Sequence, residues 1–179
     1  MAGLRKASAY SKKKVVPFTR VSKRKKKSYI KTVPPQKIVK FSMGKETLLN
    51  EKKLPYQFTV FSKEKVQIRH NALEACRQFI NRKLEKELGN QYVFKVIPYP
   101  HHIQRENKML TGAGADRMQT GMQLAYGKSS GKAAIIKSNK KIFFVAVPSK
   151  KAALLLRTTL RQIKSKLPCK TRIIEETIK

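Results

Sequence analysis

Several short stretches of the chain have the residue pattern of β-strands. Residues 36–43 alternate, placing Val39, Phe41 and Met43 on one face, and the stretch stops at Gly44. Other stretches are rich in aromatic and β-branched residues, which suit a half-buried pleated surface. These further predicted strands are residues 56–61, 91–97 and 171–174, together with a hairpin of residues 132–137 and 141–147 around a turn at Ser138–Asn139.

Two longer stretches repeat apolar residues every three or four positions, as a helix with one core-facing stripe does. The first helix is predicted from about Arg69 to Leu88 and ends before Gly89. Its stripe consists of Ala72, Leu73, Cys76, Phe79, Ile80, Leu84 and Leu88, and its outer face is predicted to expose Glu74, Glu85 and Glu87 to solvent. The second helix is predicted from about residue 150 to residue 166, with Ser149 as its N-cap and Pro168 after its end.

Five or six mostly antiparallel strands with two main helices predict an α+β fold, a two-layer sandwich. Residues 1–33 lack a clear apolar period and are predicted to be an extended basic arm. Pro34–Pro35 marks the boundary with a single domain over residues 34–179. Within that domain, residues 101–131 hold five of the eight glycines, and a loop of such length in a compact domain is usually functional or disordered.

The charge of the chain requires a polyanionic partner. The net charge is +32, and self-repulsion at this imbalance destabilises a compact monomer. Residues 1–45 contain 15 Lys and Arg but no acid, and residues 117–174 contain 14 and no acid. The 40% of hydrophobic residues nevertheless predicts a packed core. Nucleic acid and anionic membrane are the two candidate partners.

A membrane role is disfavoured, because the longest apolar runs, residues 142–147 and 152–156, are far shorter than a spanning helix. The basic N-terminus also lacks the amphipathic repeat of a membrane-surface helix. Cys76 and Cys169 have no partner at metal-ligand spacing, which favours two free thiols in a reducing, cytoplasmic compartment. We expect no metal and no cofactor.

Motifs that would indicate an enzyme are incomplete. Gly127–Lys128–Ser129 resembles the end of a phosphate-binding loop, but residue 122 is Met where that motif needs glycine. Gly112 and Gly114 lack the third glycine of a dinucleotide fingerprint. An RNA-modifying or nucleotide-using enzyme remains an alternative resting on these segments, whereas the residues favour a protein that is not an enzyme.

Three segments resemble a known family. Residues 99–128, YPHHIQRENKMLTGAGADRMQTGMQLAYGK, closely resemble the signature of the L-sixteen family of large-ribosomal-subunit proteins, in its archaeal and eukaryotic L-ten-e form. Residues 28–44 and 67–89 resemble the N-terminal segment and the first helix of that family, in the same order. The helix is similar to the archaeal branch in particular.

The resemblance implies a structural protein of the large subunit that binds rRNA beside the aminoacyl-tRNA site and supports translation and late assembly. It implies a glycine-rich loop directed toward the peptidyl-transferase region and tRNA, comprising Thr111, Gly112, Ala113, Gly114, Ala115, Asp116, Arg117, Met118, Gln119 and Thr120. Together with the charge runs it selects as rRNA-binding residues Lys12, Lys13, Lys14, Arg20, Arg24, Lys25, Lys26, Lys27, Arg69, His70, Arg105, Asn107, Lys108 and Lys128. The expected partners are large-subunit rRNA, tRNA in the aminoacyl and peptidyl sites, neighbouring ribosomal proteins and assembly factors, without homo-oligomerisation.

Overall fold

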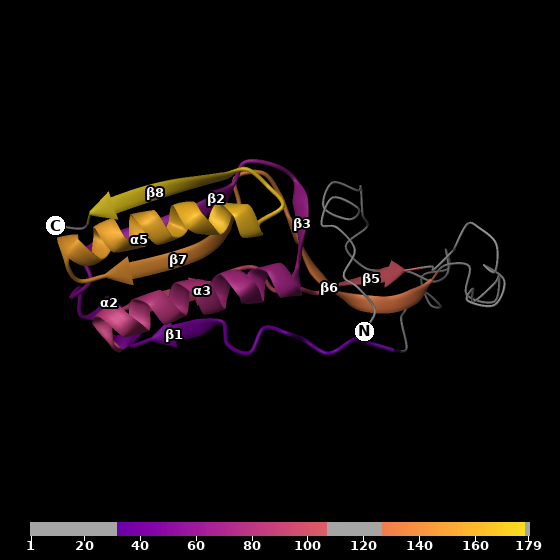
Figure 1. Cartoon of the computed structure of the whole chain (residues 1–179), viewed down its shortest axis with the longest axis horizontal. Coiled ribbons are helices and arrows are strands. Elements are labelled where there is room, and N and C mark those ends of the chain that lie inside the picture. Colours follow the sequence, from indigo (N-terminus) through magenta and orange to yellow (C-terminus); the bar gives the residue numbers. More distant parts are fainter. Residues whose placement is uncertain (1–31, 107–126, 178–179) are drawn as a thin grey trace.

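The computed structural model describes residues 32–106 and 127–177 and confirms the predicted α+β class. Its main sheet is antiparallel throughout, with the strand order β1-β4-β7-β2-β8 (Figure 1). The strands of this sheet are β1 (Ser42–Gly44), β2 (Tyr56–Ser62), β4 (Val93–Val96), β7 (Lys141–Val147) and β8 (Thr171–Thr177).

Two helices pack on one face of the main sheet, as Figure 1 shows. They are α3 (His70–Leu88) and α5 (Lys150–Gln162), and the latter continues as the 3-10 helix η3 (Ile163–Lys166). Both predicted helices are thus confirmed, as is the N-cap, because the Ser149 hydroxyl accepts a hydrogen bond of 3.2 Å from the Ala152 amide. A short helix, α2 (Thr47–Asn50), and the residues after it shield a small cluster of buried side chains on the sheet.

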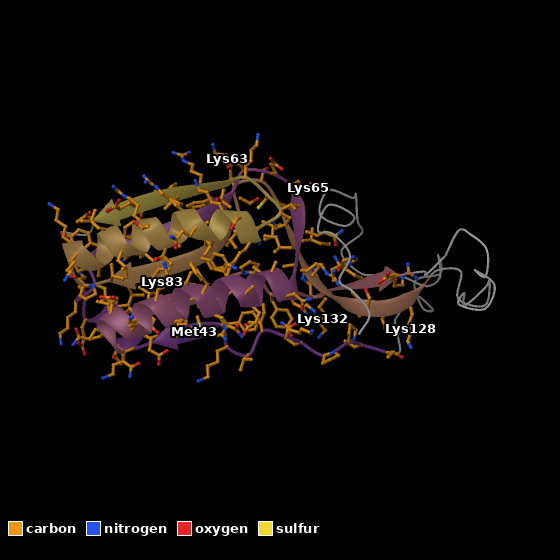
Figure 2. All side chains as sticks on the ribbon, in the orientation of Figure 1. Met43, Lys63, Lys65, Lys83, Lys128 and Lys132 are labelled. Atoms are coloured by element: carbon orange, nitrogen blue, oxygen red, sulfur yellow. The ribbon has the colours of Figure 1, made fainter. Side chains whose placement is uncertain are left out.

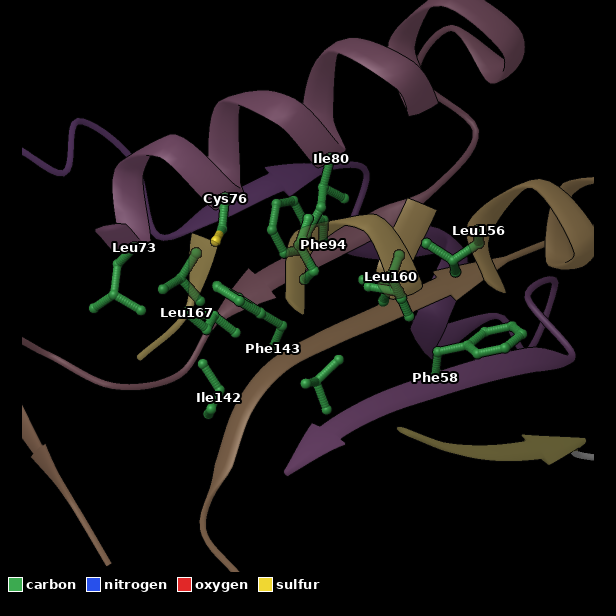
Figure 3. Packing of buried hydrophobic residues seen from close by; sticks show 14 of the residues in the cluster. Phe58, Leu73, Cys76, Ile80, Phe94, Ile142, Phe143, Leu156, Leu160 and Leu167 are labelled. Carbon is green, nitrogen blue, oxygen red and sulfur yellow. The ribbon is translucent and has the colours of Figure 1, made fainter. Parts of the chain in front are cut away.

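The core forms where the helical stripes meet the sheet (Figure 3). From α3 it takes Leu73, Cys76, Ile80 and Leu84, all with no exposed surface. Leu156 and Leu160 of α5 meet Phe58, Phe94 and Phe143 from three strands. Burying each such side chain contributes about 1.5–3 kcal/mol, so this layer is the main source of stability.

A second antiparallel sheet, of order β3-β6-β5, projects beyond the main sheet (Figure 1). Its strands are β3 (Val66–Arg69), β5 (His102–Glu106) and β6 (Lys128–Ile136). We call β5 together with residues 128–133 of β6 the extension. The predicted loop over residues 101–131 is wrong at both ends, because residues 102–106 and 128–131 pair as strands.

The predicted hairpin of residues 132–137 and 141–147 is also wrong, because its two strands belong to different sheets. β7 pairs with β2 in the main sheet, whereas β6 pairs with β3 and β5 in the second. At the crossing, the Asn139 amide donates to the Ser62 carbonyl at 2.7 Å and the Ser62 amide donates to the Lys140 carbonyl at 3.0 Å. These bonds hold two segments of the chain together, the one from β2 to β3 and the one from β6 to β7, where both pass between the two sheets.

The strand predicted over residues 36–43 is reduced to β1. Residues 32–40 have no regular secondary structure and run beside α3 (Figure 1). Val39 is 76% exposed while Met43 is buried, so the predicted common face is not formed. The neighbouring strand explains the difference, because β4 ends at Val96 and two prolines follow within four residues, and prolines lack the N–H that a ladder needs.

Candidate nucleic-acid interface

The extension carries both ends of the predicted functional loop. Glu106 and Lys128 are opposite each other in the register of β5 and β6, so residues 107–127 connect the outer ends of these two strands. The register shifts between Gln104 and Arg105, which marks a β-bulge. A bulge increases local twist and redirects side chains, and such irregularities concentrate near functional sites.

The buried side chains of β5, and a buried side chain of β3 that contacts them, are polar. Gln67, His102 and Gln104 are all at least 95% buried. The Gln104 amide donates to the Gln67 side-chain oxygen at 3.1 Å, which joins β5 to β3 across the second sheet. The Ser130 hydroxyl donates to the Gln104 carbonyl at 3.3 Å. The Gln104–Gln67 bond is buried, and losing one member of a buried polar pair costs free energy, so this bond fixes the extension against β3.

Cations gather where the extension meets α3. His70 begins α3 and is only 3% exposed, and its ring lies beside Gly131 of β6. Burial, and then the positive charges of Lys37, Arg69 and Lys132, lower the pKa of His70 to about 4. The imidazole is therefore neutral at neutral pH. It is sheltered beneath an electropositive surface that belongs to three separate chain segments.

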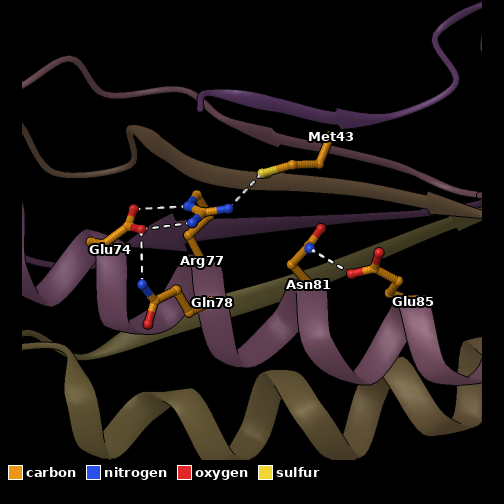
Figure 4. Close-up of polar contacts among 6 residues, drawn as sticks. All are labelled: Met43, Glu74, Arg77, Gln78, Asn81 and Glu85. Atoms are coloured by element: carbon orange, nitrogen blue, oxygen red, sulfur yellow. Dashed lines mark hydrogen bonds and ion pairs between the residues drawn. The ribbon is translucent and has the colours of Figure 1, made fainter. Parts of the chain in front are cut away.

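A buried ion pair fastens the N-terminal segment to α3 (Figure 4). The Arg77 guanidinium makes two hydrogen bonds to the Glu74 carboxylate and one to the Met43 sulfur. Glu74 is only 8% exposed, so the prediction that it faces solvent is wrong. The hydrogen bonds from Arg77 lower the pKa of Glu74 below its ordinary value, and the Val39 amide adds a further hydrogen bond with the same effect. Residues 37–43 therefore cover the face of α3 that was expected to be free.

Exposed cations lie on the outside of the extension and on the adjoining segment. Lys128 is exposed and Lys132 and Arg105 are half-buried, while Lys37 is exposed on the N-terminal segment. Figure 2 shows Lys128 and Lys132 projecting from β6. The one acid of the described extension, Glu106, faces Lys128 in the register. The excess of positive charge on this surface suits the binding of a polyanion.

A second basic surface forms at the opposite side of the crossing between the two sheets. Backbone hydrogen bonds bring three turns together there, with the Lys63 amide donating to the Lys170 carbonyl at 2.9 Å. We call it the lysine-rich surface, and its exposed members are Lys63, Lys65, Lys137, Lys140, Lys141, Lys164 and Lys170. Figure 2 shows Lys63 and Lys65 pointing outward at this edge. Such a concentration on one edge is the electrostatic footprint expected of a nucleic-acid-binding protein.

Four of the predicted rRNA-binding residues lie in the described part of the chain, at or next to the extension. Arg69 ends β3, Arg105 lies in β5 and Lys128 begins β6, whereas His70 is buried behind them. The arm residues from Lys12 to Lys27, together with Asn107, Lys108 and the loop residues from Thr111 to Thr120, lie outside the described residues.

Residue patterns did not single out Lys37, Lys132 or the lysine-rich surface. These residues are recognised from the fold. Lys37 and Lys132, for example, are 95 positions apart in the sequence, yet both lower the pKa of His70. The acid-free composition of residues 117–174 was the available signal for the lysine-rich surface. It indicated a charged half of the molecule without selecting individual side chains.

The described residues offer little for catalysis. Burial raises the pKa of the Cys76 thiol to about 12 and also raises that of Cys169, so both free thiols stay protonated at neutral pH. No cluster of three or more potential metal ligands occurs within residues 32–106 and 127–177. In the same part of the chain, none of the helices has the length and apolar character needed to cross a membrane.

The fold and these surfaces define a class, that of small, strongly basic α+β proteins with two polycationic surfaces around one apolar core. Residues 17–174 match the family described as Ribosomal protein L16p/L10e. Relatives are 39–44% identical and are named large ribosomal subunit protein uL16 in three archaea. The chain belongs to this ribosomal protein family and is a structural constituent of the large ribosomal subunit.

The relatives match over most of their length. The protein of Methanospirillum hungatei is 44% identical over 152 residues, which is 84% of this chain and 86% of the relative. That of Hyperthermus butylicus is 43% identical over 158 residues, covering 88% and 82%. That of Nanoarchaeum equitans is 39% identical over 174 residues, covering 96% and 92%. The similarity therefore spans the main sheet, both long helices and the extension.

Proposed function

We propose that the chain binds large-subunit rRNA near the aminoacyl-tRNA site and directs residues 107–126 toward the peptidyl-transferase region and tRNA. The RNA performs the chemistry. The protein supplies positive charge and a fixed position for the loop, and it takes part in late subunit assembly. Residues 1–33 act as an RNA-binding arm, and residues 34–179 as the domain that holds arm and loop in place.

The observation that carries this proposal is the structure of the extension, its strand pairing and its charge. A two-stranded projection with a polar, hydrogen-bonded interior holds both ends of a glycine-rich segment. Cations lie on its outer side and at its base. Glycine backbone permits close approach to RNA or tRNA, and phosphates of rRNA would neutralise the surrounding positive charge. The lysine-rich surface would contact a second part of the rRNA.

The partners of the proposal follow from the same features. Exposed lysines and arginines would contact phosphates, which position a protein on RNA without reading its sequence. Residues Thr111–Thr120 would contact tRNA. Assembly factors would act earlier, while the rRNA around the loop is still open. Arg105, Asn107, Lys108 and Lys128 would anchor the two ends of the loop on rRNA.

Sedimentation of cell extract tests the first part of the proposal. In moderate salt the chain should co-migrate with the large ribosomal subunit, and it should be released over a narrow range as salt rises, because counterion release makes phosphate binding steeply salt-dependent. A chain that migrates free at all salt concentrations, or only with membranes, would contradict the proposal.

Deletion of Thr111–Thr120 tests the role of the loop. Residues 107–110 and 121–127 would still join Glu106 to Lys128, so β5 and β6 should remain paired and the thermal unfolding of the isolated protein should change little. Subunits carrying the deletion should mature slowly or engage tRNA weakly. Normal subunit profiles and normal translation rates with this variant would remove the loop from the proposed function.

A further inference from the structure

The exposed apolar side chains of the described chain gather on two neighbouring segments. Apart from Leu154 of α5, the large exposed hydrophobic residues are Val33, Val39, Ile97 and Tyr99. The two segments are adjacent, because the Val96 amide donates to the Phe41 carbonyl at 2.7 Å. Exposed apolar residues that occur singly need no explanation, whereas a group on one surface marks a contact with something.

Tyr99 is the residue of this group with a fixed geometry. Its ring stacks on Phe41, with a centroid distance of 5.4 Å and an interplanar angle of 26°. Although Phe41 supports one ring face, Tyr99 remains 56% exposed, so the other face is open to solvent. The flanking Pro98 and Pro100 are buried and restrict the backbone on both sides. Little conformational freedom is therefore left to lose when a flat partner stacks on the open face.

The surroundings of the ring favour a polyanion that carries flat groups. Lys37 and Lys40 are exposed on the adjoining segment, and residues 32–45 contain no acid. The nearest acid after that segment, Glu46, is held by Lys95 at 2.6 Å. Tyr99 also lies three residues before β5, at the base of the extension. Aromatic rings beside basic residues are the usual platform for bases of single-stranded nucleic acid.

We infer that the open face of Tyr99 is a stacking site for an unpaired nucleobase of large-subunit rRNA. This inference rests on the proposed function and adds a specific site to it. Phosphates flanking the base would lie over Lys37 and Lys40, while the ring itself would contribute no charge. Stacking of this kind tolerates any base, because every base has a flat π-face.

The test compares binding of the full chain and its variants to protein-free large-subunit rRNA at several salt concentrations. Tyr99→Ala should weaken binding roughly 5- to 150-fold, the range that corresponds to loss of one base stack. The slope of log affinity against log salt should not change, because no phosphate contact is removed. Tyr99→Phe, which keeps the ring, should bind within about twofold of the unaltered chain. Irradiation of the complex should crosslink the peptide that contains Tyr99 to a single nucleotide.

Two further variants separate stacking from apolar packing. Tyr99→Leu keeps apolar bulk over Phe41 without a flat ring, so it should stay folded and still bind weakly. Leu154→Ala removes a comparably exposed apolar side chain from α5 and should bind like the unaltered chain. Thermal unfolding of each variant shows whether a loss of affinity comes from a loss of folding.

Several outcomes would overturn the inference. If Tyr99→Ala binds rRNA as well as Leu154→Ala does, the inference fails while the proposed function stands. If the unaltered chain shows no salt-dependent binding to rRNA, the proposed function fails as well. A loss that appears only when other ribosomal proteins are present would assign the ring to a protein partner. A loss that disappears after removal of residues 1–31 would assign it to the arm of this chain.

Discussion

The Glu74 carboxylate and the Arg77 guanidinium form a bidentate ion pair one turn apart on α3, with N–O distances of 2.6 and 2.8 Å. Their side chains are only 11% and 12% exposed. The same carboxylate accepts one hydrogen bond from the side-chain amide of Gln78 and another from the backbone amide of Val39. One buried acid therefore connects the helix to the segment that leads into the basic arm.

Glu74→Gln should strongly destabilise the protein, because it leaves the Arg77 charge partly buried without its partner. The free energy of unfolding should fall by about 3 kcal/mol, at the lower end for a broken buried pair because the pair retains some solvent. Denaturant titration measures this change. Hydrogen exchange of the Val39 amide should accelerate more than exchange in β7. Glu85→Gln, at an exposed position of the same helix, is the control and should change stability by less than about 0.5 kcal/mol.

Gly44 cannot accept a side chain. Its φ is +83°, and a Cβ there would lie 1.9 Å from the Tyr92 carbonyl oxygen. Gly44→Ala should therefore force β1 away from β4 and lower the free energy of unfolding by more than about 3 kcal/mol, beyond the cost of a left-handed alanine alone. Gly89→Ala is the matched control, because Gly89 also has positive φ but its Cβ would meet nothing within 4 Å. Its backbone, with φ +57° and ψ −121°, is unfavourable for alanine, so this variant should cost about 1–3 kcal/mol, less than Gly44→Ala. Equal unfolding midpoints for the two variants would contradict the steric argument.

Elements with a strong hydrophobic period were predictable from the sequence. The stripe of α3 and the strand β2, rich in aromatic and β-branched residues, are predicted to within one residue, because their burial is decided by their own pattern. The strand β5 was missed, since its buried residues are His102 and Gln104, which reverses the usual pattern of apolar residues inside. Polar interiors of this kind depend on partners such as Gln67, which is distant in sequence.

The candidate site was predictable as a charge distribution rather than as a geometry. The family resemblance and the charge runs select Arg105 and Lys128, and the strand register places them on the same extension. The burial of Glu74 was not foreseeable, since the segment that covers it has no periodicity of its own. Likewise, Lys37 and Lys132 look like any other lysines until the fold places them around His70.

The burial of His70 predicts that stability depends on pH. Its folded-state pKa of about 4 lies below its ordinary value of 6.5, so the unfolded chain binds the proton more readily in between. Stability should therefore be fully present above pH 6.5 and should fall as the pH is lowered toward 4. The slope from one such group is at most about 1.4 kcal/mol per pH unit. His70→Gln should reduce the pH dependence of the denaturation midpoint over this window.

The lysine-rich surface predicts a measurable change in the salt dependence of rRNA binding. Each lysine that neutralises a phosphate contributes about one unit to the slope of log affinity against log salt. The double variant Lys63→Gln/Lys65→Gln should therefore lower the slope for protein-free large-subunit rRNA by about two, and it should weaken binding most at low salt. Both positions are exposed on one turn, so folding should be preserved.

The control for this prediction removes the same charge from another part of the molecule. Lys52→Gln/Lys86→Gln changes two exposed lysines that belong to neither basic surface. Because neither lysine lies on a surface assigned to rRNA, this pair should alter the slope by less than about half a unit. If both double variants reduce the slope equally, only net charge matters and the lysine-rich surface is not a distinct contact. A reduction confined to Lys63 and Lys65 would place rRNA phosphates at the crossing between the two sheets.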